Sequence, residues 1–317
     1  MPARSSYVVL ACMAASVAFA VDVNDFLDAK QTSNATPFTQ DNCDKANAYH
    51  VEKLPGFTGT DDDWPCNYAG TVASNEDGTH QNFFWMYPAT DENAPVAIWL
   101  NGGPGASSTF ANFLFSSPLR IAQDGTTYSM YTSTETWITK ATMIYIDQPV
   151  GTGFSYGEPL LTTMDEAATE FVTMVKNIFA AFPELADKDL YMTGESYAGK
   201  YIPRFSWALY EDGSFNLKAS LVGDPYTAPT TQRTHTWIVP EALNIIDDTN
   251  MPQIAALIKT CQEELAIDVD TAADYCSNII GYVDEVSGGV FPYDNRIFGA
   301  DWDPQEDPVT NYFTIQP

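Results

Sequence analysis

The sequence predicts an α/β protein in which helices flank a central, mostly parallel β-sheet. Three observations lead to this fold class. Short apolar runs bounded by turn residues are typical of buried strands. An amphipathic helical pattern separates two of these runs, and a second helical pattern follows a later one. Because a helix that joins two parallel strands covers a face of their sheet, this alternation favours a sheet covered on both faces.

Six apolar runs carry the strand prediction, namely Tyr68–Ala73, Asn82–Tyr87, Val96–Leu100, Met143–Ile146, Leu190–Thr193 and Ser220–Val222. The link between the first two reads SNEDGTHQ and is rich in turn residues. This link predicts an antiparallel hairpin ahead of the parallel part of the sheet.

The helix prediction is strongest between Asp165 and Phe182, where apolar residues recur every three or four positions before Pro183. That spacing indicates one buried helix face, and the proline marks its end. From about Pro240 to Gly289 the chain becomes polar and helical, which predicts a cap-like insertion. We therefore expect a signal peptide at 1–20, the N-terminal part of the core at 21–239, and the helical insertion with an irregular tail at 240–317.

The N-terminus predicts export. After Arg4, the run YVVLACMAASVAFA ends in Ala-Phe-Ala and then turns polar, as a secretory signal peptide cleaved after Ala20 would. The alternative is an N-terminal anchor, although the run is short for a membrane span. No later stretch is long and apolar enough to span a bilayer, so we expect no membrane segment after cleavage.

Four cysteines remain once the signal peptide and its Cys12 are removed, namely Cys43, Cys66, Cys261 and Cys276. In a secreted chain they predict two disulfides, with three alternative connectivities. The pairs Cys43–Cys66 and Cys261–Cys276 are favoured because each closes a short loop.

The charge is strongly acidic, with 42 Asp and Glu residues against 14 Lys and Arg residues and a formal net charge of −28. A nucleic-acid partner is excluded because phosphate binding needs a basic surface. Repulsion among the carboxylates relaxes as they protonate, which predicts tolerance of acidic surroundings. The alternative is a merely soluble, secreted surface.

The stretch YMTGESYAGKYIP, residues 191–203, predicts a strand, a tight turn and a helix. A serine on such a turn projects its hydroxyl above the carboxyl edge of the sheet, which makes Ser196 a candidate nucleophile. The alternative is an ordinary strand-to-helix turn.

Two glycine-rich stretches follow other predicted strands. IWLNGGPGASS, residues 98–108, can present backbone N–H groups to a ligand, as an oxyanion hole requires. A phosphate loop is excluded because no Gly-Lys-Ser/Thr follows. IDQPVGTGFSYG, residues 146–157, fits a structural turn as well as a functional loop.

Together, in order and spacing, these three stretches resemble the serine carboxypeptidases, a branch of the α/β-hydrolases. The resemblance covers roughly residues 50–230. It implies an enzyme that releases C-terminal residues from peptides and proteins through an acyl-enzyme on a serine, with no metal or organic cofactor. It also implies a secretory-pathway protein that is extracellular or resides in a vacuole or lysosome.

The resemblance also assigns roles by position. Ser196 would attack the peptide carbonyl, and the backbone N–H groups of Gly103 and Tyr197 would bind the oxyanion. The substrate's terminal carboxylate would be recognised by Trp99, Asn101, Gly102 and Glu195. A glutamate beside a carboxylate implies that one of the two acids is protonated, which favours acidic pH.

The chain departs from the family at three positions. Ala106 stands where the family has a disulfide-bonded cysteine, Phe115 stands where it has a second glutamate, and Lys200 replaces a frequent histidine. The change at Phe115 weakens the expected preference for free C-termini.

The catalytic triad of this fold follows the order Ser, Asp, His along the chain. His50 and His80 precede Ser196, and His235 follows it before any further predicted strand. We therefore expect the acid, the histidine and the last strands of the sheet to lie beyond residue 317. The chain is then either an incomplete copy of an active enzyme or an inactive relative. A secreted binding protein without catalysis, and an acyltransferase or esterase of the same fold, are the alternative functions. No His, Cys and carboxylate cluster has metal-ligand spacing, so we expect no metal.

Overall fold

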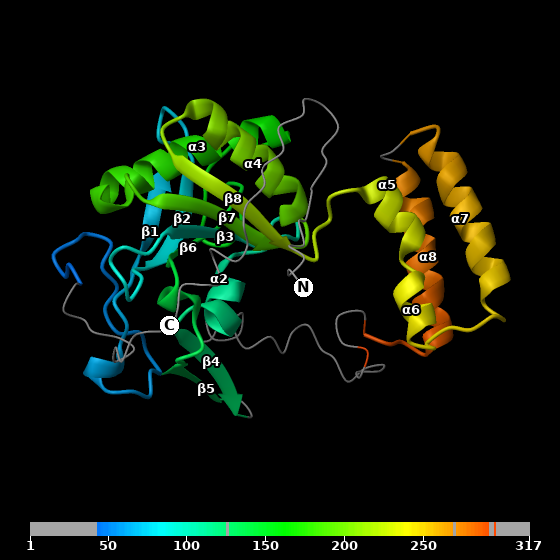
Figure 1. Cartoon of the computed structure of the whole chain (residues 1–317), viewed down its shortest axis with the longest axis horizontal. Helices are drawn as coiled ribbons and strands as arrows, with labels where there is room; N and C mark the ends of the chain where they lie inside the picture. The colour runs from blue at the N-terminus through cyan, green and yellow to red at the C-terminus, as the bar shows by residue number, and fades with distance from the viewer. Residues whose placement is uncertain (1–42, 125–126, 269–270, 292–294, 296–317) are drawn as a thin grey trace, which may run out of the picture. The chain divides into compact units, whose positions relative to one another are not determined.

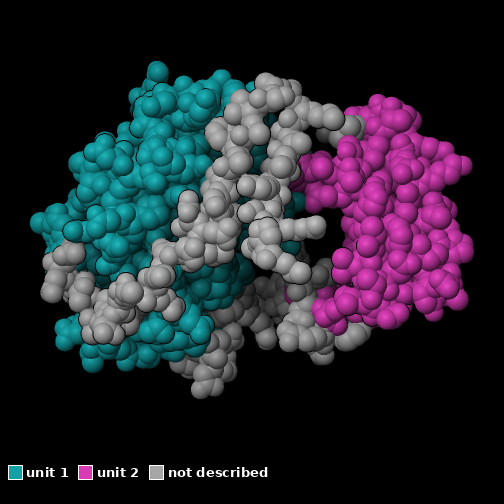
Figure 2. Space-filling model, in the orientation of Figure 1, with its two compact units in different colours: residues 1–225, 308–317 teal, residues 226–307 magenta. Residues whose placement is uncertain are grey.

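The computed structural model describes residues 43–124, 127–268, 271–291 and 295. The predicted signal peptide at 1–20 and the tail at 301–317 lie outside the described residues. The chain forms two compact units that meet in the sequence between Pro225 and Tyr226, and each unit is described by itself (Figures 1 and 2).

The first unit contains a six-stranded sheet. Its strands, in spatial order, are β1 (Tyr68–Ala73), β2 (Gln81–Tyr87), β6 (Thr142–Ile146), β3 (Val96–Leu100), β7 (Asp189–Glu195) and β8 (Asn216–Gly223). The pairs β1–β2 and β2–β6 are antiparallel, whereas β6–β3, β3–β7 and β7–β8 are parallel. All six predicted strands, the hairpin and the α/β fold class are thereby confirmed.

The centre of the sheet is buried on both faces. Every residue of β3 and β6 is buried, as expected for parallel strands covered by other elements. Because side chains alternate along a strand, Ile98 and Leu100 of β3 enter the core on one face, and Trp99 enters the core on the other.

Two helices cover the first face of the sheet, α3 (Met164–Ala181) and α4 (Ala198–Asp212) (Figure 1). Helix α3 starts in a capping box, in which Glu166 N donates to Thr163 Oγ1 over 3.2 Å and Thr163 N donates to Glu166 Oε2 over 3.0 Å. The short helix η5 (Pro183–Leu185) follows its end. The buried stripe of α3 is the one that the apolar spacing predicts.

The other face of the sheet packs against elements that the sequence did not predict. These are the hairpin β4 (Leu119–Asp124) and β5 (Thr127–Thr132), helix α2 (Thr109–Ala111) and a π-helical turn, η3 (Asn112–Ser116). The 3₁₀ turns η2 (Asp61–Asp63) and η4 (Trp137–Thr139) complete the unit. The sequence did not predict this hairpin because polar residues interrupt the apolar runs in both of its strands.

The second unit is helical, with α5 (Pro229–Gln232), η6 (Arg233–His235), α6 (Ile238–Ala242), α7 (Met251–Leu265) and α8 (Ala272–Ser287). It begins earlier than the expected boundary at 239/240. The reason is Trp237, which packs against the small apolar cluster around Cys261, Cys276 and Ile279. The segment before Pro240 therefore belongs to the helical unit.

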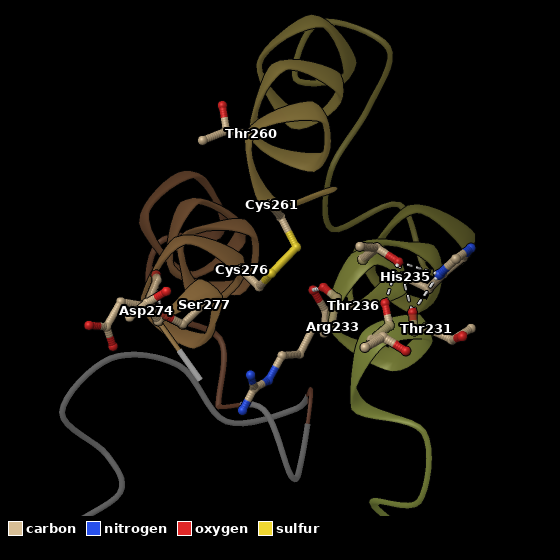
Figure 3. The surroundings of a disulfide bond; sticks show 12 residues. Thr231, Arg233, His235, Thr236, Thr260, Cys261, Asp274, Cys276 and Ser277 are labelled. Carbon is tan, nitrogen blue, oxygen red and sulfur yellow. Dashed lines mark hydrogen bonds between the residues drawn. A yellow bond between two sulfur atoms is a disulfide. The ribbon is translucent and has the colours of Figure 1, made fainter. Parts of the chain in front are cut away.

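Each unit contains one disulfide. Cys43–Cys66 lies in the first unit, and Cys261–Cys276 joins α7 to α8 in the second (Figure 3). Both are the local pairs that the loop-closure argument favours. Among the described residues, no helix combines the length and the apolar character needed to cross a membrane.

A matched pair of substitutions tests the packing of α4. Phe205 is fully buried and stacks on Phe171 with 4.5 Å between ring centroids, whereas Trp207 on the same helix is 48% exposed. We expect Phe205→Ala to lower the free energy of unfolding by about 3–5 kcal/mol through loss of apolar contacts and the cavity left behind. Trp207→Ala should change it by about 0.5 kcal/mol or less. Chemical denaturation followed by fluorescence measures both, and equal losses would contradict this packing.

Candidate active site

The three motif stretches follow three strands that are neighbours in the sheet. Residues 147–157 follow β6, residues 101–108 follow β3, and residues 196–203 follow β7. Because these strands are parallel, their carboxyl ends meet at one edge. Such an edge is where ligands bind in open α/β sheets.

Ser196 lies on the turn between β7 and α4 in a left-handed backbone conformation, with φ of 59°. A residue other than glycine rarely adopts this conformation, because its Cβ crowds the backbone. The turn is held by Ser196 N donating to Gly223 O over 3.1 Å and by Gly199 N donating to Ser196 O over 2.9 Å. Nucleophile elbows have the same strand-turn-helix arrangement, in which a serine side chain projects from the sheet edge.

Gly102 lies directly against this turn. A Cβ on Gly102 would collide with the backbone N of Tyr197, and it would lie 2.9 Å from Ser196 Cβ and 3.0 Å from Glu195 O. On the strand side, a Cβ on Gly194 would collide with Leu100 O. The ends of β3 and β7 therefore approach each other so closely that only glycine fits at both positions.

The loop that begins at Gly102 turns back sharply. Gly103 and Gly105 have φ of 101° and 80°, and Ala106 N donates to Gly102 O over 3.2 Å. The backbone of Gly105 lies near the hydroxyl of Tyr201 on α4 and acts to lower the pKa of that hydroxyl. Burial raises the pKa of that hydroxyl to about 12, so Tyr201 stays protonated at physiological pH.

Asn101, at the start of this loop, is buried and oriented by its neighbours. The Trp99 indole N–H donates to Asn101 Oδ1 over 2.6 Å. Because the oxygen is occupied, the Nδ2 group is the side of the amide that can donate to a ligand. Asn101 N donates to Ser108 Oγ over 3.1 Å, which fixes the backbone as well.

Two aromatic rings cover Trp99. Phe115 and Trp137 each contact it edge to face, with centroid distances of 5.5 and 5.4 Å. Both are about two-fifths exposed, so the surface next to Asn101 is apolar. The buried guanidinium of Arg120 donates to the carbonyls of Phe115 and Glu135, which holds the two segments that carry these rings.

Glu195 supplies the acid on the turn. Burial raises the pKa of the Glu195 carboxyl above its usual range, and the neighbouring carboxylate of Asp224 raises it further. A protonated carboxyl can donate a hydrogen bond to a carboxylate ligand, which an ionised one cannot.

The three histidines contact residues outside the Ser196 turn. His80 is buried, and its Nδ1 lies 2.7 Å from Glu170 Oε1 on α3. His50 contacts the ring of Tyr68. His235 belongs to the second unit, where its Nδ1 lies 2.6 Å from Thr231 O within its own turn (Figure 3). Among the described residues, no group of three or more His, Cys, Asp and Glu side chains could hold a metal ion.

The structure also contains a feature for which the sequence motifs assign no role. Asp147, the first residue after β6, is buried and accepts hydrogen bonds from both glycine-rich loops. The motif IDQPVG contains this residue, yet a sequence pattern does not show which donors converge on it.

With this geometry in place, comparison with known proteins identifies the class. The serine carboxypeptidase family model matches residues 55–303, so the chain belongs to the serine carboxypeptidase family. In the crystal structure of Kex1(Δ)p, a prohormone-processing carboxypeptidase from Saccharomyces cerevisiae, the matching part has a TM-score of 0.64 and 28% identity. The match covers 75% of this chain and 57% of that one.

Curated relatives give the same family. The pheromone-processing carboxypeptidase KEX1 of Debaryomyces hansenii is 32% identical over 72% of this chain and 35% of its own length. Carboxypeptidase Y homolog A of Ajellomyces dermatitidis is 33% identical over 72% of this chain and 44% of its own length. The chain thus spans less than half the length of these two relatives.

The contact at Gly102 leads to a direct test. Gly102→Ala should lower the free energy of unfolding by about 1–3 kcal/mol, because the added methyl must displace the turn that carries Ser196. The matched control is Gly281→Ala in α8, where an added Cβ meets no described atom within 4 Å. Chemical denaturation measures both variants, and an unchanged stability of Gly102→Ala would contradict the close approach.

Proposed function

We propose that this protein is a serine-type carboxypeptidase that releases C-terminal residues from peptides and proteins through an acyl-enzyme on Ser196. The observation that carries the proposal is the contact of Gly102 with the Ser196 turn. It brings a strained serine and a glycine-rich loop to one edge of a parallel sheet. The two curated relatives are carboxypeptidases, which supports the reaction class.

In this proposal Ser196 Oγ attacks the carbonyl carbon of the last peptide bond, and the proton of its hydroxyl passes to the nitrogen of that bond as the C–N bond breaks. The negative charge that develops on the carbonyl oxygen is bound by the backbone N–H groups of Gly103 and Tyr197. The acyl part of the peptide stays on Ser196, the C-terminal amino acid leaves, and water then releases the acyl group.

Recognition of the C-terminus falls to residues on the two turns. The Nδ2 group of Asn101 donates to the substrate carboxylate, and Trp99 keeps that amide in place through its bond to Oδ1. The protonated Glu195 carboxyl donates a second hydrogen bond, helped by its raised pKa. The Gly102 backbone contributes from the adjacent loop.

One observation favours a second function. The ring of Phe115 packs on Trp99 and presents an apolar surface where a further acid would strengthen carboxylate binding. An esterase or acyltransferase of the same fold, acting on a substrate without a free carboxylate, fits that surface.

We also propose that the protein passes through the secretory pathway to the cell exterior or to a vacuole or lysosome. Two disulfides support this, because they persist in oxidising compartments. The acidic charge agrees with an acidic destination.

Replacement of the nucleophile tests the reaction. Ser196→Ala in the 317-residue chain should lower the release of the C-terminal residue from an N-blocked dipeptide at pH 5, because the acyl-enzyme then cannot form. The blocked dipeptide ester, assayed in parallel, separates peptidase from esterase activity. Equal rates for the wild type and Ser196→Ala would refute the catalytic proposal and favour a binding protein.

The raised pKa of Glu195 predicts how substrate binding depends on pH. As the pH rises through this pKa the carboxyl ionises and repels the substrate carboxylate, so KM for a peptide with a free C-terminus should rise. Glu195→Gln should remove the rise, because the amide donates without titrating. Asp224→Asn should move the rise to lower pH, since one cause of the raised pKa is gone.

An amidated peptide is the control in this experiment, because it lacks the carboxylate and should show no rise in KM. A KM profile shared by both peptides would exclude Glu195 from carboxylate recognition.

The raised pKa of Glu195 also affects stability. The native state binds the proton of Glu195 more tightly than the unfolded state does. The contribution of Glu195 to the free energy of unfolding therefore falls as the pH rises from the ordinary pKa through the raised one.

A further inference from the structure

We infer that Asp147 is a positioning residue for the proposed hydrolysis, because its carboxylate holds the loop of residues 101–109 in the geometry that presents the Gly103 N–H to the Ser196 turn. This inference rests on the proposed function. Asp147 itself does not contact the Ser196 turn in any hydrogen bond of the described residues, so it acts through the loop.

The carboxylate of Asp147 joins two loops. Its Oδ1 accepts from Ser107 Oγ over 2.7 Å and from Ser108 N over 2.8 Å, both in the loop after β3. Its Oδ2 accepts from Phe154 N over 3.0 Å, in the loop after β6. One side chain thus fixes the far end of the glycine-rich loop against the neighbouring strand.

Ser108 connects this fixed end of the loop to Asn101 at its start. The Ser108 hydroxyl donates to Ile146 O over 2.6 Å and accepts from Asn101 N over 3.1 Å. The start of the loop is therefore bonded to Ser108, and Ser107 and Ser108 are bonded to the end of β6. The segment between these bonds, residues 102–106, includes Gly102, which contacts the Ser196 turn, and Gly103, which supplies the oxyanion N–H in the proposed reaction.

Burial of the Asp147 carboxylate costs free energy, which indicates that this residue does more than fill space in the core. Asp147 is 1% exposed, and no lysine or arginine of the described residues forms an ion pair with it. A buried carboxylate without a cation is stable only when hydrogen bonds replace its water. Because the donors come from two different loops, the carboxylate keeps all of its hydrogen bonds only while the two loops keep their positions relative to each other.

Gly153 gives an independent way to disturb the same carboxylate. A Cβ on Gly153 would collide with Asp147 Oδ2 and lie 2.6 Å from its Cγ and 2.9 Å from Ser107 Oγ. Gly153→Ala therefore displaces the Asp147 carboxylate without altering its chemistry. Gly213→Ala is the matched control, because Gly213 also has a positive φ but no described atom lies within 4 Å of an added Cβ.

Asp147→Asn changes the chemistry instead. Its NH₂ group replaces an acceptor with a donor among groups that all donate, so at least one bond to the loops is lost. Asp189→Asn is the matched control. Asp189 lies at the amino-terminal end of β7, opposite the site, where it accepts from Asn216 Nδ2 over 2.6 Å.

The test combines steady-state kinetics with hydrogen exchange of the 317-residue chain. For Asp147→Asn and Gly153→Ala we expect kcat to fall by about 10- to 100-fold while KM stays within about twofold, because the oxyanion is bound only in the transition state. Amide exchange should accelerate in peptides covering residues 101–109 and stay unchanged in the β1–β2 hairpin. Asp189→Asn and Gly213→Ala should show neither effect.

Two outcomes would overturn the inference. One is wild-type kcat and wild-type loop exchange in both site variants. The other is an exchange increase spread over the whole first unit, which would make Asp147 a general stability residue. If Asp147→Asn fails to fold, Gly153→Ala and Ser107→Ala decide by the same readouts. If the wild type releases no residue, the proposed hydrolysis has failed, and the exchange of residues 101–109 still decides whether Asp147 positions the loop.

Discussion

The edge of the sheet that carries Ser196 depends on the close approach of two backbones, at the ends of β3 and β7. Parallel pairing puts both ends at the same edge, and the glycines at 102 and 194 remove the side chains that would keep them apart. The left-handed Ser196 is tolerable there because hydrogen bonds to Gly223 and from Gly199 fix the turn around it. The shape of the site therefore comes from main-chain packing, and the side chains act on a geometry that the sheet has already set.

Three neighbouring strands share the work of holding that geometry. The strand order β6–β3–β7 places the loop that follows β3, residues 101–108, between the loop that contains Asp147 and the turn that contains Ser196. On one side Asp147 and Ser108 hold this loop through hydrogen bonds, and on the other side Gly102 packs against the turn that contains Ser196. A glycine-rich loop would otherwise be among the most mobile parts of a chain. The conformational freedom of the glycines allows this loop to turn sharply. The contacts with the neighbouring strands and turns then keep the loop in one conformation.

Much of the fold could be predicted because the central strands are buried on both faces and read as continuous apolar runs, as Val96–Leu100 does. The hairpin of β4 and β5 could not be predicted, because polar residues interrupt the apolar runs of both strands. These two strands also form a separate two-stranded sheet and are not part of the central one. At the site, short motifs pointed to Ser196, Gly102 and Gly103. The part played by Asp147 was not predictable, because Ser107 and Ser108 lie about 40 residues earlier in the chain and only the sheet order brings them to it. Likewise, the start of the helical unit depended on where the side chain of Trp237 packs.

The positions of the two disulfides have a consequence for how the chain matures. Cys43 pairs with Cys66 and Cys261 pairs with Cys276, so each bond joins cysteines that are consecutive among the four in the described residues. During synthesis each of these four cysteines can therefore meet its native partner before the next pair is made. Oxidation in the order of translation leads directly to the native connectivity, and no wrong bond has to be reshuffled by an isomerase. Each unit also closes its own crosslink, so one can finish oxidative folding before the other has left the ribosome.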